Sequence, residues 1–257
     1  NPMTTEQEYL RVSLRANLLT ALAENLKHEE GGIRLFELGR IYIPRTEDLP
    51  DEREVLCGLL CRPETEVSWH GGGEPPDFFA AKGVVEGLLG YLGVVAGFQK
   101  SSDGGLHPNK QAAVVVEGVN IGVIGELHPQ VLSGFENAEP AYIFEINLPS
   151  LLPFTAGYEV FQPVPRFPPT VRDIALVLPD NIAHGDVIEV IRGFPLVKKV
   201  TLFDVYTGER IPPGTKSLAY RIVYQSPTHT LTDAEVNGVQ QQVLDRLSHD
   251  LGATLRS

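Results

Sequence analysis

The sequence is poor in cysteine, tryptophan and methionine, with two, one and one among 257 residues. Cys57 and Cys61 are too few for a disulfide framework, and no further soft ligands follow at a spacing that suits zinc. On one strand, the two side chains would face the same side, too far apart for an easy disulfide. We therefore expect buried, reduced thiols, as in a cytoplasmic protein.

Long apolar runs are also absent. No stretch of about 18 apolar residues occurs, so we expect no membrane-spanning helix and no membrane partner. Residues 1–5 lack the basic and apolar segments of a secretory signal. Because the first residue is Asn1, we expect a fragment of a longer chain, although a tag scar or processing would leave the same start.

Basic residues are scarce in the first part of the chain. Residues 1–159 hold 11 Lys and Arg against 23 Asp and Glu, whereas residues 160–257 hold 10 of each kind. The net charge of −12 therefore belongs to the first part, which is a poor phosphate-binding surface by itself. The neutral second part can still collect its cations on one face.

The first part reads as an α+β domain over residues 1–152, an antiparallel sheet with flanking helices. A leucine repeat after the pair Thr5 and Glu8, typical of a capping box, predicts a helix over 5–27. Strands are expected at 33–43, 55–61 and 142–148, a helix at 77–92 and a hairpin over 112–127 that turns at 118–120. Residues 45–54 and 64–76 read as loops.

The second part, residues 165–257, follows a linker at 153–164. Strands are expected at 172–178, 197–206, 217–225 and 253–256, and helices at 186–192 and from the capping box of Thr232 and Glu235 to Gly252. This order describes a ferredoxin-like split βαβ domain with both helices on one face of the sheet. The other sheet face is left open.

Strand alternation predicts which side chains line that open face. Along 217–225, Leu218, Tyr220, Ile222 and Tyr224 share one face, and Ser217, Arg221 and Gln225 lie on the other. Along 200–206, alternation groups Val200, Leu202, Asp204 and Tyr206 together, opposite Thr201, Phe203 and Val205. Cations and aromatic rings on an exposed sheet suit single-stranded RNA, although an ordinary solvated face has the same pattern.

Three other features could carry chemistry. His107 and His128, each before a proline, could hold a metal with Glu126, or each could cap a turn. Glycines 71–73 lack the strand, Lys and helix of a phosphate loop, so we interpret them as a flexible loop. Arg11 and Arg15 would share one face of the first helix, where they could bind an anion, pair with Glu8 or contact a partner subunit.

Several segments together resemble the C-terminal half of the bacterial phenylalanyl-tRNA synthetase beta subunit. In the first part these are Leu14-Arg-Ala-Asn-Leu-Leu19, Leu35-Phe-Glu-Leu-Gly-Arg40, Asp77-Phe-Phe-Ala-Ala-Lys-Gly83, Leu106-His-Pro108 and Ile124-Gly-Glu-Leu-His-Pro129. In the second part they are Phe167-Pro-Pro-Thr-Val-Arg-Asp173, Leu202-Phe-Asp-Val-Tyr206, Lys216-Ser-Leu-Ala219 and Thr230-Leu-Thr-Asp233. Their order and spacing cover nearly the whole chain.

The resemblance implies a class II synthetase-like, catalytic-like module followed by a ferredoxin-fold anticodon-binding domain. It also implies a catalytic alpha subunit, an (αβ)₂ heterotetramer and tRNA(Phe) as partners. ATP and Mg²⁺ would serve the whole enzyme, with no cofactor and no metal in this fragment. The editing and magnesium-binding regions of the family lie upstream of the matched region.

The residues agree that the first module is not catalytic. Residues 35–40 do not form the Phe-Arg-x-Glu arrangement, and no Gly-x-Gly-x-Gly-x-Glu-Arg segment occurs in the chain. Without those arginines, charge developing on a phosphate would not be stabilised.

We therefore expect the non-catalytic tRNA-binding and assembly part of a phenylalanine–tRNA ligase. A stand-alone RNA-binding or regulatory paralogue is the alternative, and a metal enzyme built on the two histidines is a third. Arg11 and Arg15 are the subunit-interface candidates. The tRNA-binding candidates are Arg172, Lys198, Lys199, Lys216, Ser217, Arg221 and Gln225.

Overall fold

The computed structural model describes residues 9–46, 48–63, 73–135, 137, 139–155 and 165–256. The chain divides into two compact units, Asn1–Glu159 and Val160–Ser257. The division falls within the predicted linker at 153–164. At its start, Leu152–Phe154 forms a 3-10 helix (η2), and residues 156–164 lie outside the described part. The units are described separately below.

The first unit contains a six-stranded antiparallel sheet in the order β1-β2-β6-β5-β4-β3. Its strands are β1 (Ile33–Ile43), β2 (Asp51–Cys61), β3 (Gly97–Lys100), β4 (Leu106–Val116), β5 (Val119–Leu127) and β6 (Ala141–Asn147). The antiparallel sheet with flanking helices that the sequence predicts is confirmed. β2 begins inside the segment expected as a charged loop, because its first residues pair with the end of β1.

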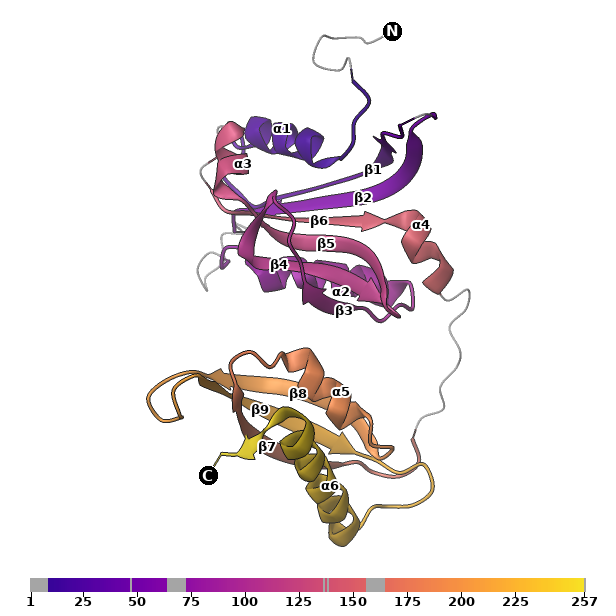
Figure 1. Cartoon of the computed structure of the whole chain (residues 1–257), viewed down its shortest axis with the longest axis vertical. Coiled ribbons are helices and arrows are strands. Elements are labelled where there is room, and N and C mark those ends of the chain that lie inside the picture. Colours follow the sequence, from indigo (N-terminus) through magenta and orange to yellow (C-terminus); the bar gives the residue numbers. More distant parts are fainter. Residues whose placement is uncertain are drawn as a thin grey trace. The chain divides into compact units, whose positions relative to one another are not determined.

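Helices cover both faces of this sheet (Figure 1). Leucines of α1 (Arg15–Asn25) and α3 (Pro129–Gly134) pack on one face, beside Cys57 and Cys61. The apolar side of α2 (Phe78–Tyr91) packs on the other, together with Leu151 of α4 (Leu148–Leu151). The two cysteines are buried and free, as predicted, and burial raises the pKa of both thiols, that of Cys61 to about 11.

The first helix is shorter than predicted. It begins at Arg15 rather than at residue 5, and the proposed capping pair of Thr5 and Glu8 lies outside the described residues. Before α1 the chain runs along the sheet edge, where the Tyr42 amide donates to the Arg11 carbonyl at 2.9 Å. Leu10 belongs to the leucine repeat but lies before α1 and is 62% exposed. The repeat is therefore longer than the helix that forms.

Two further local predictions in the first unit, the cap of α2 and the hairpin turn, agree with the structure to within one residue. Asp77 caps α2 by accepting a hydrogen bond from the Ala80 amide at 2.7 Å. The hairpin of β4 and β5 is present, but its two turn residues are Glu117 and Gly118, with φ of 49° and 82°. Two successive positive φ values are typical of a type I′ turn, which matches strand twist. The turn therefore begins one residue earlier than predicted.

The second unit has the predicted split βαβ topology. Its sheet has the order β10-β7-β9-β8, with β7 (Thr170–Pro179), β8 (Val197–Tyr206), β9 (Thr215–Tyr224) and β10 (Thr254–Leu255). Helices α5 (His184–Arg192) and α6 (Asp233–Leu251) pack on one face around a shared apolar core. The capping box of Thr232 and Glu235 is confirmed, and Gly252 ends α6 with φ of 64°.

Candidate nucleic-acid interface

The sheet face of the second unit that the helices leave uncovered is the candidate site. On β9, Leu218, Tyr220, Ile222 and Tyr224 are buried on the helix side, as strand alternation predicts. Arg221 is exposed on the opposite side. The helix-covered and open faces of β9 were therefore predictable from its sequence.

On β8 the predicted alternation is wrong at one point. Val200 and Leu202 lie opposite Ile222 and Tyr220 on the helix side, but a β-bulge separates Leu202 from Asp204. After the bulge, Asp204 pairs with Ala219 and Tyr206 with Ser217. The extra residue reverses the side to which later residues point. Tyr206 therefore joins the open face, although the sequence grouped it with Val200.

Arg221 lies in the middle of the open face. Its guanidinium donates two hydrogen bonds to Asp173 on β7, at 2.8 and 2.7 Å, and lies 5.4 Å from the ring centre of Phe203. The hydrogen bonds from Arg221 hold the pKa of Asp173 below its usual range. Arg221 is thus positioned for contact with a ligand, but its charge is largely balanced within the face.

Arg256 is the functional candidate that the sequence reasoning missed. Its backbone amide donates to the Ala175 carbonyl at 2.9 Å, which fixes it beside β7. From there the guanidinium reaches Tyr206, 4.7 Å from the ring centre, and donates to Ser217 Oγ at 3.4 Å. Within the part of the chain that the structure describes, no carboxylate pairs with it. The predicted strand at 253–256 was the signal that could have placed it here.

The other predicted tRNA-binding residues are dispersed. Ser217 is on the open face, but it is only 3% exposed, next to the Arg256 side chain. Arg172 shares the helix side with Ile174 and pairs with Asp233 at the start of α6. Residues two apart on a strand point to the same side of the sheet, so Arg172 lies on the helix side with Ile174 and not on the open face.

Three lysines and one glutamine are the remaining predicted tRNA-binding residues. Lys199 is exposed and pairs with Val223, which places it on the open face, and Lys198 is exposed beside it. Lys216 donates to the Asp180 carbonyl at 2.8 Å, and Gln225 donates to the Phe167 carbonyl at 2.7 Å. The open face thus carries Arg221 beside Phe203, Arg256 beside Tyr206, and Lys199. The roles of all these residues in binding stay predictions.

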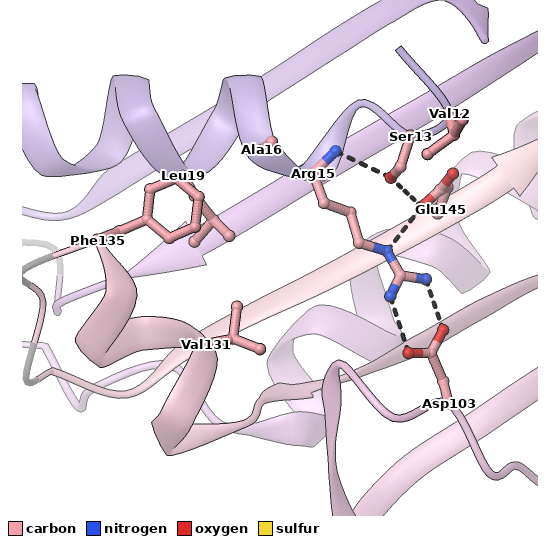
Figure 2. A pocket seen from close by; sticks show the side chains of 9 residues that line it. All are labelled: Val12, Ser13, Arg15, Ala16, Leu19, Asp103, Val131, Phe135 and Glu145. Atoms are coloured by element: carbon pink, nitrogen blue, oxygen red, sulfur yellow. Dashed lines mark hydrogen bonds and ion pairs between the residues drawn. The ribbon is translucent and has the colours of Figure 1, made fainter. Parts of the chain in front are cut away.

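In the first unit, the main polar cluster centres on Arg15 (Figure 2). Its guanidinium donates to both carboxylate oxygens of Asp103, at 2.9 and 2.8 Å, and to Glu145 at 2.7 Å. Burial disfavours the charged form, but the bonds and charges of these two carboxylates outweigh it and raise the pKa of Arg15. Hydrogen bonding to Arg15 lowers the pKa of Asp103.

This cluster borders an open cavity of about 450 Å³ between α1, α3 and the sheet. Because two carboxylates already hold Arg15, the cavity offers little attraction to a phosphate. Arg11, which precedes α1 rather than lying on it, pairs with Glu37 at 2.5 Å and donates to the Arg40 carbonyl. Both arginines thus have partners within their own unit, and their role at a subunit interface stays a prediction.

The two histidines each accept a hydrogen bond from the backbone amide two residues further along the chain. His107 Nδ1 accepts a hydrogen bond from the Asn109 amide and His128 Nδ1 accepts one from the Gln130 amide, each at 3.2 Å. Glu126 is held by Lys110 and by the Tyr142 hydroxyl, at 2.5 and 2.9 Å. Across the described residues, no three His, Cys, Asp or Glu side chains are grouped as metal ligands. The turn-capping interpretation holds for His128, which caps the first turn of α3, whereas His107 lies within strand β4. The geometry gives the metal hypothesis no support.

A chelator should therefore leave the protein unchanged. We expect EDTA to shift the thermal unfolding midpoint by less than about 1 °C, since no metal binding would be linked to folding. Differential scanning fluorimetry with EDTA, and then with excess Zn²⁺, measures this shift. A clear rise with Zn²⁺ that the substitution His128→Ala removes would revive the metal hypothesis.

Each of the two units matches a known protein family. The family described as "Phenylalanyl tRNA synthetase beta chain CLM domain" matches residues 1–148. The chain belongs to this family. Residues 165–256 match a second family, "Ferredoxin-fold anticodon binding domain", over the unit that carries the open face. The resemblance found in the sequence is thereby confirmed, as is the ferredoxin-like fold of the second unit.

Curated relatives match the whole chain. The phenylalanine–tRNA ligase beta subunit of Dehalococcoides mccartyi is 45% identical over 257 residues, covering 100% of this chain and 32% of the relative. The beta subunit of Geobacillus kaustophilus is 39% identical over 260 residues, covering 99% of this chain and 32% of the relative. The chain thus spans about a third of the length of these relatives.

Among solved structures, a pyrrolysyl tRNA synthetase of Desulfitobacterium hafniense has a TM-score of 0.42 and 17% identity, covering 55% of this chain and 48% of that one. This likeness is too low to carry an argument, so the class II likeness of the first sheet stays a prediction. None of the helices in the described part of the chain is long and apolar enough to span a membrane.

Proposed function

We propose that this chain is the non-catalytic tRNA-binding and assembly part of a phenylalanine–tRNA ligase beta subunit. The observation that carries the proposal is the open face of the second unit, with Arg256 against Tyr206 and Arg221 against Phe203. The match to an anticodon-binding family over the same residues supports it. In the assembled enzyme, the second unit holds the anticodon region of tRNA(Phe), and an alpha subunit supplies the chemistry.

The chemistry of the open face suits unpaired nucleotides. Bases stack on aromatic rings and on arginine planes, and each stacked base contributes about 1–3 kcal/mol. Arg256 pairs with no carboxylate in the described chain, so its full charge is available to a phosphate. A base that stacks on Tyr206 displaces or sandwiches the guanidinium, which can then contact the neighbouring phosphate.

ATP and Mg²⁺ belong to the alpha subunit in this proposal. The cations beside the first sheet do not fit a nucleotide, because Arg15 and Arg11 are held by Asp103, Glu145 and Glu37. A triphosphate placed there would meet those carboxylates. The first unit instead serves assembly, packing with alpha subunits in an (αβ)₂ heterotetramer in the cytoplasm.

The substitution Arg256→Ala should weaken binding of tRNA(Phe) by about tenfold and reduce the slope of log affinity against log salt by about 1. The loss follows from removing a cation and a stacking plane together. Fluorescence anisotropy of labelled tRNA(Phe), titrated with the full chain at several salt concentrations, measures both quantities. Arg246→Ala is the matched control, because Arg246 is an exposed arginine on α6 that pairs with Asp250. Equal losses in the two variants would contradict the proposal.

The ion pair of Asp173 and Arg221 allows a second test of tRNA binding to the open face. Asp173→Asn should strengthen tRNA binding by about three- to fivefold, because it removes an anion and releases Arg221. Arg221→Ala should weaken binding less than Arg256→Ala does, since its charge is already balanced. If Asp173→Asn weakens binding, the open face is not where the phosphates lie.

A stand-alone RNA-binding paralogue is the competing reading, and family membership favours the synthetase over it. Co-expression with an alpha subunit of the family separates the two. A stable complex that co-purifies through an affinity tag is expected, and tRNA binding without any such complex would favour the paralogue.

A further inference from the structure

The cavity beside Arg15 has an apolar end and a charged end (Figure 2). Leu19 from α1, Val131 from α3 and Phe135, which follows α3, lie at the apolar end. The Arg15 guanidinium and its two carboxylate partners form the other end. The volume of about 450 Å³ lies within the range of sites that bind small molecules. A cavity with these two ends suits a ligand that is itself apolar at one end and charged at the other.

The charged end carries one negative charge in excess. Among the described residues that line the cavity, Arg15 is the one cation, against the carboxylates of Asp103 and Glu145. Asp103 uses both of its oxygens to accept hydrogen bonds from Arg15. Glu145 accepts from Arg15 at 2.7 Å and from Ser13 Oγ at 3.3 Å, in both cases through Oε2. Its other oxygen, Oε1, has no hydrogen-bond partner within the described chain.

Glu145 is held firmly but remains accessible. It lies on the central strand β6, between Cys57 of β2 and Val123 of β5, and its side chain is 15% exposed. Among the described side chains, Tyr224 Oη is the one fully buried polar atom that lacks a partner, so Glu145 Oε1 is reached by solvent. A part-buried carboxylate oxygen without a donor is satisfied best by a positively charged hydrogen-bond donor.

We propose that this cavity binds a small organic amine. Its ammonium group donates to Glu145 Oε1, and its apolar body packs against Val131 and Phe135. A ligand with a carboxylate or phosphate in place of the ammonium group would meet the excess negative charge instead. This inference is independent of the proposed tRNA-binding face, which lies in the second unit.

Phenethylamine is the probe, with phenethyl alcohol as its neutral analogue and hydrocinnamate as its anionic one. Titration of the full ¹⁵N-labelled chain, followed by amide chemical shifts, gives the Kd and the place of binding. We expect a Kd of about 1 mM for the amine, as befits so small a ligand. The alcohol should bind about five- to tenfold more weakly, and hydrocinnamate more weakly still. The largest shifts should fall at Ser13, Arg15 and Glu145. An amine that binds no more tightly than the alcohol, or that shifts amides elsewhere, would overturn the proposal.

Glu145→Gln separates charge from shape. The amide oxygen of glutamine still accepts hydrogen bonds from Arg15 and Ser13, whereas the negative charge is gone. The amine should therefore lose its five- to tenfold advantage, while the Kd of the alcohol stays unchanged. A preference for the amine that persists in Glu145→Gln would contradict its contact with Glu145.

Glu139→Gln is the matched control, because Glu139 pairs with Arg62 outside the cavity. It should leave the Kd of all three ligands unchanged. Val131→Ala tests the apolar end, and it should weaken the amine and the alcohol equally, by about threefold, because both lose contact with the same methyl groups. Unchanged binding of both ligands in Val131→Ala would show that their apolar bodies lie elsewhere, and the proposed site would be wrong.

Discussion

Replacing Arg15 with alanine is expected to lower the free energy of unfolding of the first unit by about 3 kcal/mol. The Arg15 side chain is only 20% exposed, and its removal leaves Asp103 and Glu145 as part-buried carboxylates without a cation. Such uncompensated charges cost more than the ion pair itself contributes. Urea denaturation followed by far-UV circular dichroism measures the change, with the two units treated as separate transitions.

Arg40→Ala is the matched control. Arg40 pairs with Glu52 and Glu54, but every member of that group is more than half exposed, so a loss of about 0.5 kcal/mol is expected. If the two variants lose the same stability, the Arg15 cluster is no more than a surface ion pair.

The effect of Arg15→Ala should also depend on pH. Because Arg15 lowers the pKa of folded Asp103, the pair stabilises the fold at pH values above the unfolded pKa of about 4. That contribution is lost as the pH falls through the lowered pKa. The difference between wild type and variant should therefore shrink below about pH 4, which denaturation at several pH values would show.

Gly122→Ala should lower the stability of the first unit by a similar amount, about 3 kcal/mol, for a steric reason. Gly122 pairs with Ile146 where β5 meets β6 near the centre of the sheet. An added Cβ atom would overlap the Glu145 carbonyl oxygen and crowd Ile146. The backbone of β6 cannot yield as a flexible side chain would, so the two strands must separate. Urea denaturation measures the loss.

Gly134→Ala provides the comparison for this variant. It adds the same methyl group at a helical glycine with open space around it, and it should change stability by less than about 1 kcal/mol. A wild-type urea midpoint in Gly122→Ala would mean that β5 and β6 can shift apart at little cost.

The amino-acid sequence by itself determined those features that rest on nearest neighbours along the chain. Asp77 caps α2, Thr232 and Glu235 cap α6, and Gly252 ends it, because each signal involves residues within one helical turn. The alternation of β9 placed its apolar side chains under the helices and Arg221 on the open face for the same reason. The resemblance to a synthetase family rested on segments of this local kind.

Only the tertiary structure decided which distant groups meet. The partners of Arg15, Asp103 and Glu145, lie 88 and 130 residues away in the sequence. No residue near Arg15 in the sequence predicts either contact. A bulge in β8 turned Tyr206 onto the open face, and the pairing of β10 with β7 brought Arg256 to its ring. Arg172 met Asp233 on the helix side instead. Strand order and register set these contacts, and both depend on how all the strands and helices pack together, which no short segment encodes.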